Sequence, residues 1–392
     1  MSNFGTTAVH TGSEPDPRTG AVIPPISLST TFAQAAAAQP VGDFEYSRSD
    51  NPNRGQFEQV IAALEKGKYG LAYSSGSAAT ANILQSLAVG ANVVSISDVY
   101  GGTYRYFARV ATAHNIKTSW VADIKNNLAA AITPETRLVW IESPSNPTLT
   151  ITDIAAVAKT VRERREAGQE IYLVVDNTFL SPYVQNPLEL GADIVMHSVT
   201  KYINGHSDVV MGVVVVKDDG LHEKLRFMQN AIGAVPSPFD SWLAHRGVKT
   251  LHLRAAAAST NAQAIAEYLE SQLGGLVESV SYPGLKSHPQ AELIARQHRN
   301  GLGGGMISFR IKGGAKEASD FCAAAKIFTL AESLGGIESL CEVPAAMTHA
   351  GIPKEQREES GVYDNLVRLS VGIEDKDDLV ADIAQALKAA TA

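Results

Sequence analysis

Between about residues 57 and 217, short apolar runs alternate with stretches of helical periodicity, and this alternation strongly constrains the fold. The apolar runs are YGLAY, ANVVSIS, RLVWIE, IYLVVD, ADIVMHS and VVMGVVVVK. Between them, SAATANILQSLA and ITDIAAVAKTVRERREAG have the period of helices. Short buried runs that alternate with helices are typical of parallel strands. The sequence therefore predicts an α/β fold with a mostly parallel sheet and helices on both faces.

The segments on either side of this region have different sequence patterns. Residues 1–50 contain several prolines and no sustained period, so we expect an arm that lies on another surface. After Gly247 come a long alanine-rich helical stretch, the strand-like runs MISFRIKGG and LVRLSVG, and a final helical stretch. We therefore expect an arm (1–50), an α/β domain (51–250) and a smaller α+β C-terminal domain (251–392).

Charge and cysteine usage exclude several classes of function. The chain has 33 Lys and Arg against 41 Asp and Glu, a formal net charge of −8 without long runs. Nucleic acids and anionic membranes need clustered positive charge, so neither partner is expected. No stretch of about 18 apolar residues occurs, and the N-terminus lacks a signal-peptide core, which favours a cytoplasmic protein. Cys322 and Cys341 lack zinc or disulfide spacing, so no metal site is expected.

A serine- and glycine-rich turn joins the run YGLAY to the helical stretch that follows. It contains Ser74, Ser75, Gly76 and Ser77. In parallel α/β proteins ligands bind at the carboxyl ends of strands, where a helix start offers free N–H groups and a positive dipole end. We therefore hypothesise that Gly76 and Ser77 bind a phosphate, although such residues also cap helices that bind nothing.

Two further apolar runs end in residues that can carry chemistry. IYLVVD ends in Asp176, and ADIVMHS leads into Ser198, Thr200 and Lys201. If these two strands are neighbours, all four side chains line one crevice. Each has an ordinary explanation, because Asp-Asn is common in turns and most lysines are solvated. Together with a phosphate-binding helix start, however, they match the needs of pyridoxal 5′-phosphate (PLP).

PLP forms a Schiff base with a lysine, and its ring nitrogen needs an acidic partner. Lowering the pKa of a lysine makes its amine available as a nucleophile. We therefore predict that PLP is the cofactor, that Lys201 is the Schiff-base lysine and that Asp176 keeps the ring nitrogen protonated.

Six motifs resemble the trans-sulfuration (Cys/Met metabolism) family of PLP-dependent enzymes. They are EYSRSDNPN, DVYGGTYRYF, ESPSNPT, VDNTFLSP, HSVTKYINGHSD and FTLAESLGG, and the resemblance runs from about Val9 to the C-terminus. It implies the PLP-dependent transferase fold (fold type I), with an arm, a large mostly parallel domain and a smaller C-terminal domain. It also implies a homotetramer, built as a dimer of dimers, with active sites shared across the dimer.

Position by position, the resemblance assigns the residues at the cofactor. Lys201 and Asp176 match the Schiff-base lysine and the pyridine partner, and Tyr100 matches the aromatic residue that stacks on the ring and assists proton transfer. The implied phosphate contacts are Gly76, Ser77, Ser198 and Thr200, with Tyr46 and Arg48 reaching the phosphate of the neighbouring subunit.

The resemblance also assigns the substrate site. Arg368 matches the arginine that binds the substrate α-carboxylate, a task suited to its planar fork. Asn146 and Ser333 match residues that orient the carboxylate and the cofactor, with Tyr46 nearby, and Glu332 matches an acid facing the distal amino end of the substrate. Without the resemblance, Arg368 reads as a surface strand residue and Glu332 as a solvated loop charge.

Within the family, the likeness is greatest to the members that cleave L-cystathionine by γ-elimination to L-cysteine, 2-oxobutanoate and ammonia, in cysteine biosynthesis. Methionine-cleaving members typically carry Cys where this chain has Gly102, and they lack the acid at Glu332. The nearest alternative is γ-replacement, which joins cysteine to an O-acylated homoserine with almost the same residues. A non-catalytic PLP-binding homologue would lack the lysine or the arginine. A plain nucleotide-binding protein would need a Rossmann glycine fingerprint, which the sequence lacks.

Overall fold

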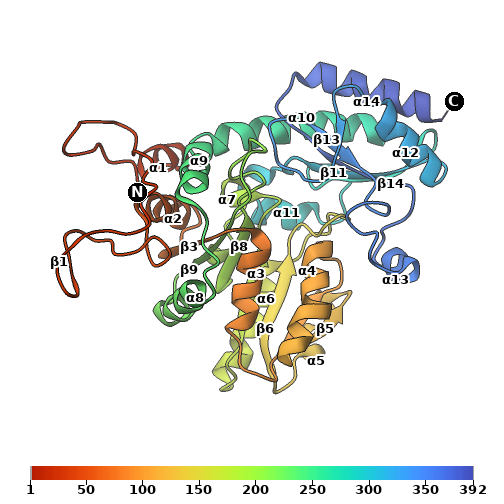
Figure 1. Ribbon diagram of the computed structural model, residues 1–392. Helices are drawn as coiled ribbons and strands as arrows, with labels where there is room; N and C mark the ends of the chain where they lie inside the picture. The colour runs from red at the N-terminus through yellow and green to blue at the C-terminus, as the bar shows by residue number, and fades with distance from the viewer. Residues whose placement is uncertain (1, 392) are drawn as a thin grey trace.

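The computed structural model describes residues 2–391, and a seven-stranded sheet forms its larger part (Figure 1). In chain order the strands are β3 (Tyr69–Tyr73), β4 (Asn92–Ile96), β5 (Lys117–Val121), β6 (Thr136–Glu142), β7 (Tyr172–Asp176), β8 (Ile194–Ser198) and β9 (Gly212–Val216). Their spatial order is β3-β9-β8-β7-β6-β4-β5. Strands β8, β7, β6, β4 and β5 pair in parallel, whereas β9 runs antiparallel to both neighbours. The predicted mostly parallel sheet is confirmed.

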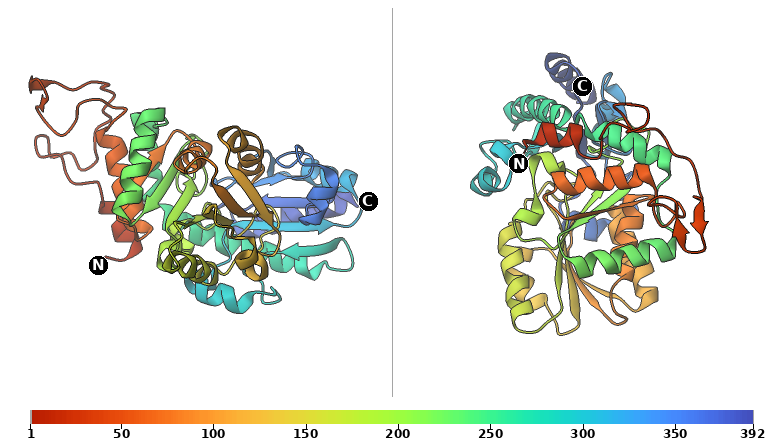
Figure 2. Two further views of the ribbon diagram at one scale, coloured as in Figure 1. Left: turned by 90° about the horizontal axis from the view of Figure 1, so that it is seen from below. Right: turned by 90° about the vertical axis from the view of Figure 1, so that its left-hand side faces the viewer.

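Helices lie on both faces of this sheet (Figure 2). They include α2 (Pro52–Leu64), α3 (Gly76–Gln85), α5 (Ile124–Ala131), α6 (Ile154–Glu166), α8 (Asp219–Ile232) and α9 (Pro238–Val248). Each begins after a Ser, Asp or Asn whose side chain accepts a backbone N–H of the first turn. Such caps satisfy donors that would otherwise lack partners, so the local sequence fixes where these helices start.

The strands differ in how strongly their sequences mark them. The valines of β9, from Val213 to Val216, are fully buried, as expected for a strand covered on both faces. The edge strand β5 was not predicted, because Lys117, Thr118 and Ser119 break its apolar run and only Val121 is buried. An edge strand with polar residues resembles a loop in sequence.

A second sheet of five strands lies in the C-terminal part of the chain (Figure 1). Its order is β10-β11-β14-β13-β12, built from β10 (Val277–Ser281), β11 (Met306–Ile311), β12 (Thr329–Leu330), β13 (Leu340–Glu342) and β14 (Leu366–Ser370). The helices α10 (Leu251–Ser271) and α12 (Ala315–Ala324) both pack against α14 (Lys376–Ala390), and all three contribute to its core. Ala255 of α10 belongs to the core of the large sheet, whereas Ile265 belongs to the second core, so α10 joins the two.

The N-terminal segment projects away from both sheets (Figures 1 and 2). Its helix α1 (Phe4–His10) packs on its own chain, with Phe4 buried and its ring 5.2 Å from that of Tyr183. Further along the segment, Ser13 bonds His245, and Trp242 donates to the backbone oxygen of Pro24 at 2.8 Å. Beyond these contacts, β1 (Gln34–Ala36) and β2 (Gln39–Pro40) form a small exposed hairpin.

Short elements complete the described chain. They are α4 (Gly101–Arg105), η1 (Tyr106–Val110), η2 (Ala111–His114), α7 (Ser181–Val184), η3 (Pro187–Glu189), α11 (Ala291–Gln297), η4 (Arg299–Gly301) and α13 (Lys354–Glu359). Within residues 2–391 no helix has the length and apolar character needed to cross a membrane.

Candidate active site

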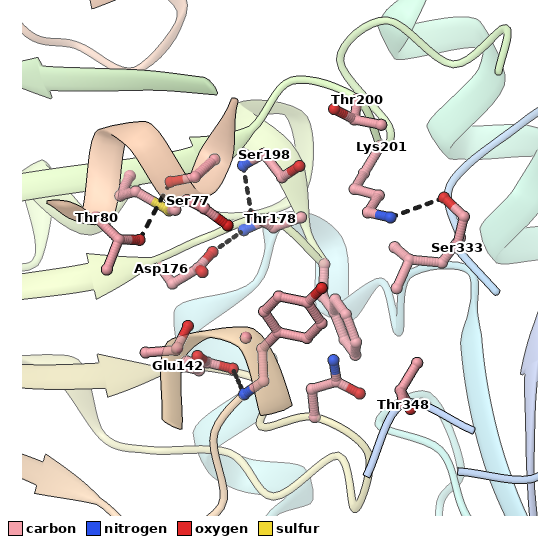
Figure 3. Close-up of a pocket in the computed structure, with 18 of the residues that line it drawn as sticks. Ser77, Thr80, Glu142, Asp176, Thr178, Ser198, Thr200, Lys201, Ser333 and Thr348 are labelled. Carbon is pink, nitrogen blue, oxygen red and sulfur yellow. Dashed lines mark hydrogen bonds between the residues drawn. The ribbon is translucent and has the colours of Figure 1, made fainter. Parts of the chain in front are cut away.

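A pocket of about 300 Å³ lies where the carboxyl ends of β6, β7 and β8 meet the start of α3 and loops of the C-terminal part (Figure 3). This is the edge at which parallel α/β sheets bind ligands. The predicted site residues that line it are Gly76, Ser77, Tyr100, Asn146, Asp176, Ser198, Thr200, Lys201, Glu332, Ser333 and Arg368. Segments more than 250 residues apart in sequence therefore converge on one cavity.

The start of α3 forms one end of the pocket. Ser75 caps the helix by accepting the N–H of Ala78 at 3.0 Å. A Cβ on Gly76 would lie 3.1 Å from Cβ of Ser198, and one on Gly212 would collide with the carbonyl oxygen of Ser75. A side chain at Gly212 would therefore force the backbone to shift, and one at Gly76 would be crowded, so the helix, β8 and β9 approach closely here. The free N–H groups and positive dipole end of this ten-residue helix suit a phosphate.

Lys201 reaches the middle of the pocket from the loop after β8. Its Nζ donates to Oγ of Ser333 at 2.7 Å (Figure 3). Burial, and then the positive charge of Arg368, lower the pKa of Lys201 to about 8. The neighbouring Thr200 is fixed, because its hydroxyl bonds the backbone N–H and C=O of Met211. This is an amine that can lose its proton near neutral pH.

Asp176 ends β7, directly beside β8. Its Oδ1 accepts the N–H of Thr178 at 3.0 Å, and Oγ1 of Thr178 accepts the N–H of Ser198 at 2.9 Å. Burial raises the pKa of Asp176, and the bonds from Thr178 oppose that shift. A carboxyl group that is partly shielded from water in this way gains from a positive partner such as a protonated ring nitrogen. Lysine, carboxyl group and helix start therefore fit PLP.

Arg368 lies on β14 and is only 3% exposed. Its Nη1 donates to Oδ1 of Asn146 at 2.9 Å, and Nη2 donates to the backbone oxygen of Ser333 at 3.1 Å. Nη2 also lies 3.0 Å from Oε2 of Glu342, its neighbour across the strand pair, which is 1% exposed. Thr348 completes the arrangement by donating to Oε1 of Glu342 at 2.8 Å. The guanidinium is thus held on several sides and keeps further donors for a ligand.

Ser333 joins the lysine to the arginine through a rarely populated backbone conformation. Its φ is +102°, a value that L-residues other than glycine seldom adopt. In this conformation its hydroxyl faces Lys201 while its carbonyl faces Arg368. Strain of this kind is typical of functional sites, where the surrounding structure maintains it.

Tyr100 and Glu332 lie at more accessible parts of the pocket. Tyr100 is 43% exposed, and its N–H donates to Oε2 of Glu142 at 3.0 Å. A Cβ on Gly102 would collide with the Tyr100 ring, so the glycine allows the ring to lie over it. Glu332 is exposed and lines the pocket, where its carboxylate raises the pKa of Lys201 and so opposes the shift from burial.

Tyr46 and Arg48 do not reach the pocket of their own chain. Nη1 of Arg48 donates to the backbone oxygen and Oδ1 of Asn230, at 2.8 and 2.7 Å. The guanidinium lies 5.5 Å from the centre of the ring of Tyr46, a residue that is 47% exposed. The pair is thus ordered on the projecting arm, outside the site.

The residues that line or support the pocket but were not predicted include four that can carry hydrogen bonds or charge there: Glu142, Thr178, Glu342 and Thr348. Glu142 ends the apolar run RLVWIE as Asp176 ends IYLVVD, so the same signal was present for both. Thr178 follows Asp176 in VDNTFLSP and was open to the same reading. Glu342 and Thr348 have no such signal, because their role depends on the pairing of β13 with β14.

Known proteins match this chain along almost its whole length. The family model described as Cys/Met metabolism PLP-dependent enzyme matches residues 5–388. A cystathionine gamma-lyase of Saccharomyces cerevisiae is 62% identical over 388 residues, covering 99% of this chain and 98% of the relative. One of Dictyostelium discoideum is 55% identical over 385 residues, covering 98% and 97%. A crystal structure of cystathionine gamma-lyase from yeast has a TM-score of 0.96 and 61% identity, covering 100% of this chain and 99% of that chain.

Proposed function

The chain belongs to the Cys/Met metabolism family of PLP-dependent enzymes, with PLP as its cofactor, and on that premise we propose that it is a cystathionine γ-lyase. The observation that carries the proposal is the near-full-length identity of 62% to a relative of that name. The convergence of Lys201, Asp176, Arg368 and Glu332 on one pocket is consistent with it. The proposed reaction cleaves the Cγ–S bond of L-cystathionine and, with water, gives L-cysteine, 2-oxobutanoate and ammonia.

Substrate binding is assigned to the C-terminal side of the pocket. The free donors of Arg368 bind the α-carboxylate, and Asn146 keeps the guanidinium in place through its bond of 2.9 Å. Ser333 adds a hydroxyl beside the amine of Lys201. Glu332, exposed within the lining, attracts the ammonium group at the distal end of cystathionine.

The chemical steps are assigned to Lys201, Tyr100 and Asp176 of this chain. PLP, when bound, supplies an electrophilic carbon for the substrate amine and a ring that accepts electrons. Nζ of Lys201 removes the proton from Cα of the substrate and later moves a proton at Cβ. The hydroxyl of Tyr100 gives a proton to the departing sulfur as the Cγ–S bond breaks. Asp176 is the residue that would keep the ring nitrogen of PLP protonated.

The test is product analysis with purified holoenzyme and L-cystathionine. We expect cysteine and 2-oxobutanoate in equal amounts, and we expect Lys201→Ala to lower the rate by about 10²–10⁴-fold or more. A yellow protein that ignores cystathionine but condenses cysteine with an O-acylated homoserine would replace this proposal with γ-replacement.

The assembly, compartment and domain bounds are part of the same proposal. We assign a homotetramer in which Tyr46 and Arg48 complete the neighbouring subunit's site; the exposed position of this pair and of arm residues such as Leu28 supports it. We assign a cytoplasmic location, which the two buried free thiols support because free thiols persist in reducing compartments. The arm (1–50), the PLP-binding domain (51–250) and the C-terminal domain (251–392) keep the bounds proposed from sequence, in keeping with the two separate cores.

A further inference from the structure

Two carboxyl groups lie side by side at the base of the pocket. Glu142, the last residue of β6, is the Cα partner of Asp176, the last residue of β7. Paired residues of neighbouring parallel strands point to the same face, and both line the pocket (Figure 3). Glu142 is the deeper of the two, since it is only 4% exposed whereas Asp176 is half-buried.

The contacts of Glu142 link it to the ring-stacking tyrosine. Its Oε2 accepts the backbone N–H of Tyr100 at 3.0 Å (Figure 3), and its Oε1 is buried without a hydrogen-bond partner. Asp176 instead accepts the N–H of Thr178. Over residues 2–391, neither carboxyl group has a lysine, arginine or histidine nitrogen within 4.0 Å.

Charge balance limits how this pair can ionise. Two neighbouring buried carboxylates repel each other, and one of them then holds a proton unless cations compensate both. Burial, and then Asp176, hold the pKa of Glu142 well above its usual range. The N–H of Tyr100 and the side chain of Trp140 oppose this shift, and Asp98 adds to it. His197 favours ionisation of Asp176, and PLP brings a single protonated ring nitrogen. Lys201 and Arg368 lie in the same lining, but they bond Ser333, Asn146 and Glu342 instead.

We propose that Glu142 is a positioning residue: it keeps its proton, holds Tyr100 by the backbone, and leaves Asp176 as the single negative charge facing the ring nitrogen of PLP. A neutral acceptor fixes the tyrosine without adding a second negative charge beside Asp176. This role concerns the cofactor and not the substrate. A failure to cleave cystathionine would therefore not refute it.

Infrared difference spectroscopy of the holoenzyme tests the proton. Glu142→Gln is a near-isosteric neutral replacement, and the spectrum of wild type minus this variant should contain the C=O stretch of a protonated carboxylic acid. The same subtraction with Asp382→Asn is the matched control, because Asp382 is a buried acid on α14 that accepts the N–H groups of residues 326–328. Its spectrum should instead contain carboxylate bands. Carboxylate bands from Glu142 would overturn the proposal.

PLP binding tests the positioning role. We expect Glu142→Gln to change the dissociation constant of PLP by less than about 3-fold, whereas Glu142→Leu, which leaves the N–H of Tyr100 without an acceptor, weakens it by about 10-fold. The visible circular dichroism of bound PLP, which reports stacking, should change in Glu142→Leu only, and Asp382→Asn should match the wild type. Equal losses in the Gln and Leu variants, or an unaltered Leu variant, would each refute the proposal.

Discussion

At the scale of single residues, Lys201 titrates where moderate changes in pH alter the amount of free amine. Burial and Arg368 lower its pKa from 10.5 to about 8. The cost of burying the protonated amine is therefore present in full below pH 8 and is relieved as the pH rises towards 10.5. We expect the rate at which apoprotein binds PLP to rise with pH up to about 8 and then to level off. Stopped-flow absorbance measures this rate, and a rise that continues past pH 10 would contradict the environment described for Lys201.

Glu342 is a second residue whose environment gives a sharp expectation. It forms a buried ion pair with Arg368 and accepts the hydroxyl of Thr348. Glu342→Ala leaves the arginine charge buried without compensation, so the free energy of unfolding should fall by about 3–5 kcal/mol. Glu342→Gln, which can still contact both neighbours, should lose less. Urea denaturation of holoenzyme compares the three proteins, and an unchanged Glu342→Ala midpoint would show that the pair contributes little.

At the scale of elements, the end of the pocket that we propose for the phosphate depends on close packing of β9 against the start of α3. A Cβ at Gly212 would collide with the carbonyl oxygen of Ser75, the residue that caps α3. Gly212→Ala should therefore cost about 1–3 kcal/mol of stability and weaken PLP binding, because the helix start must shift. Gly275→Ala is the control, since its Cβ would make only an ordinary contact at 3.4 Å. Thermal melts and PLP titration give both quantities. Equal stability and equal PLP affinity of the two variants would argue against close packing of β9 on the start of α3.

At the scale of the whole molecule, the arm gives the clearest expectation. Arg48 lies outside the pocket of its own chain, and we assign it to a neighbouring subunit's site. Arg48→Ala and Lys201→Ala proteins should each have little activity, whereas subunits mixed after reversible dissociation should regain activity. A mixed dimer contains one site with both native residues. The control carries both substitutions in one chain and should regain nothing when mixed with itself. No recovery in the mixed sample would indicate that each chain builds its site alone.

Much of the fold follows from the sequence, because local patterns determine it. The run of β9 is apolar throughout and that of β7 is apolar up to Asp176, and sequences with strand or helix periodicity can bury their apolar faces in few ways. The sequence also placed Asp176, Ser198 and Lys201 together, since the ends of neighbouring parallel strands share one edge. The polar edge strand β5 escaped prediction because its residues carry no such pattern.

Tertiary structure alone decided the rest of the site. Pairing of β13 with β14 sets Glu342 beside Arg368, and pairing of β6 with β7 sets Glu142 beside Asp176. Neither sequence distance nor residue type specifies these contacts, because they depend on which strands become neighbours and in what register. The lowered pKa of Lys201 likewise depends on burial and on Arg368, which lies far away along the chain. The sequence by itself determined which groups stand at the strand ends; only packing determined which charges face one another.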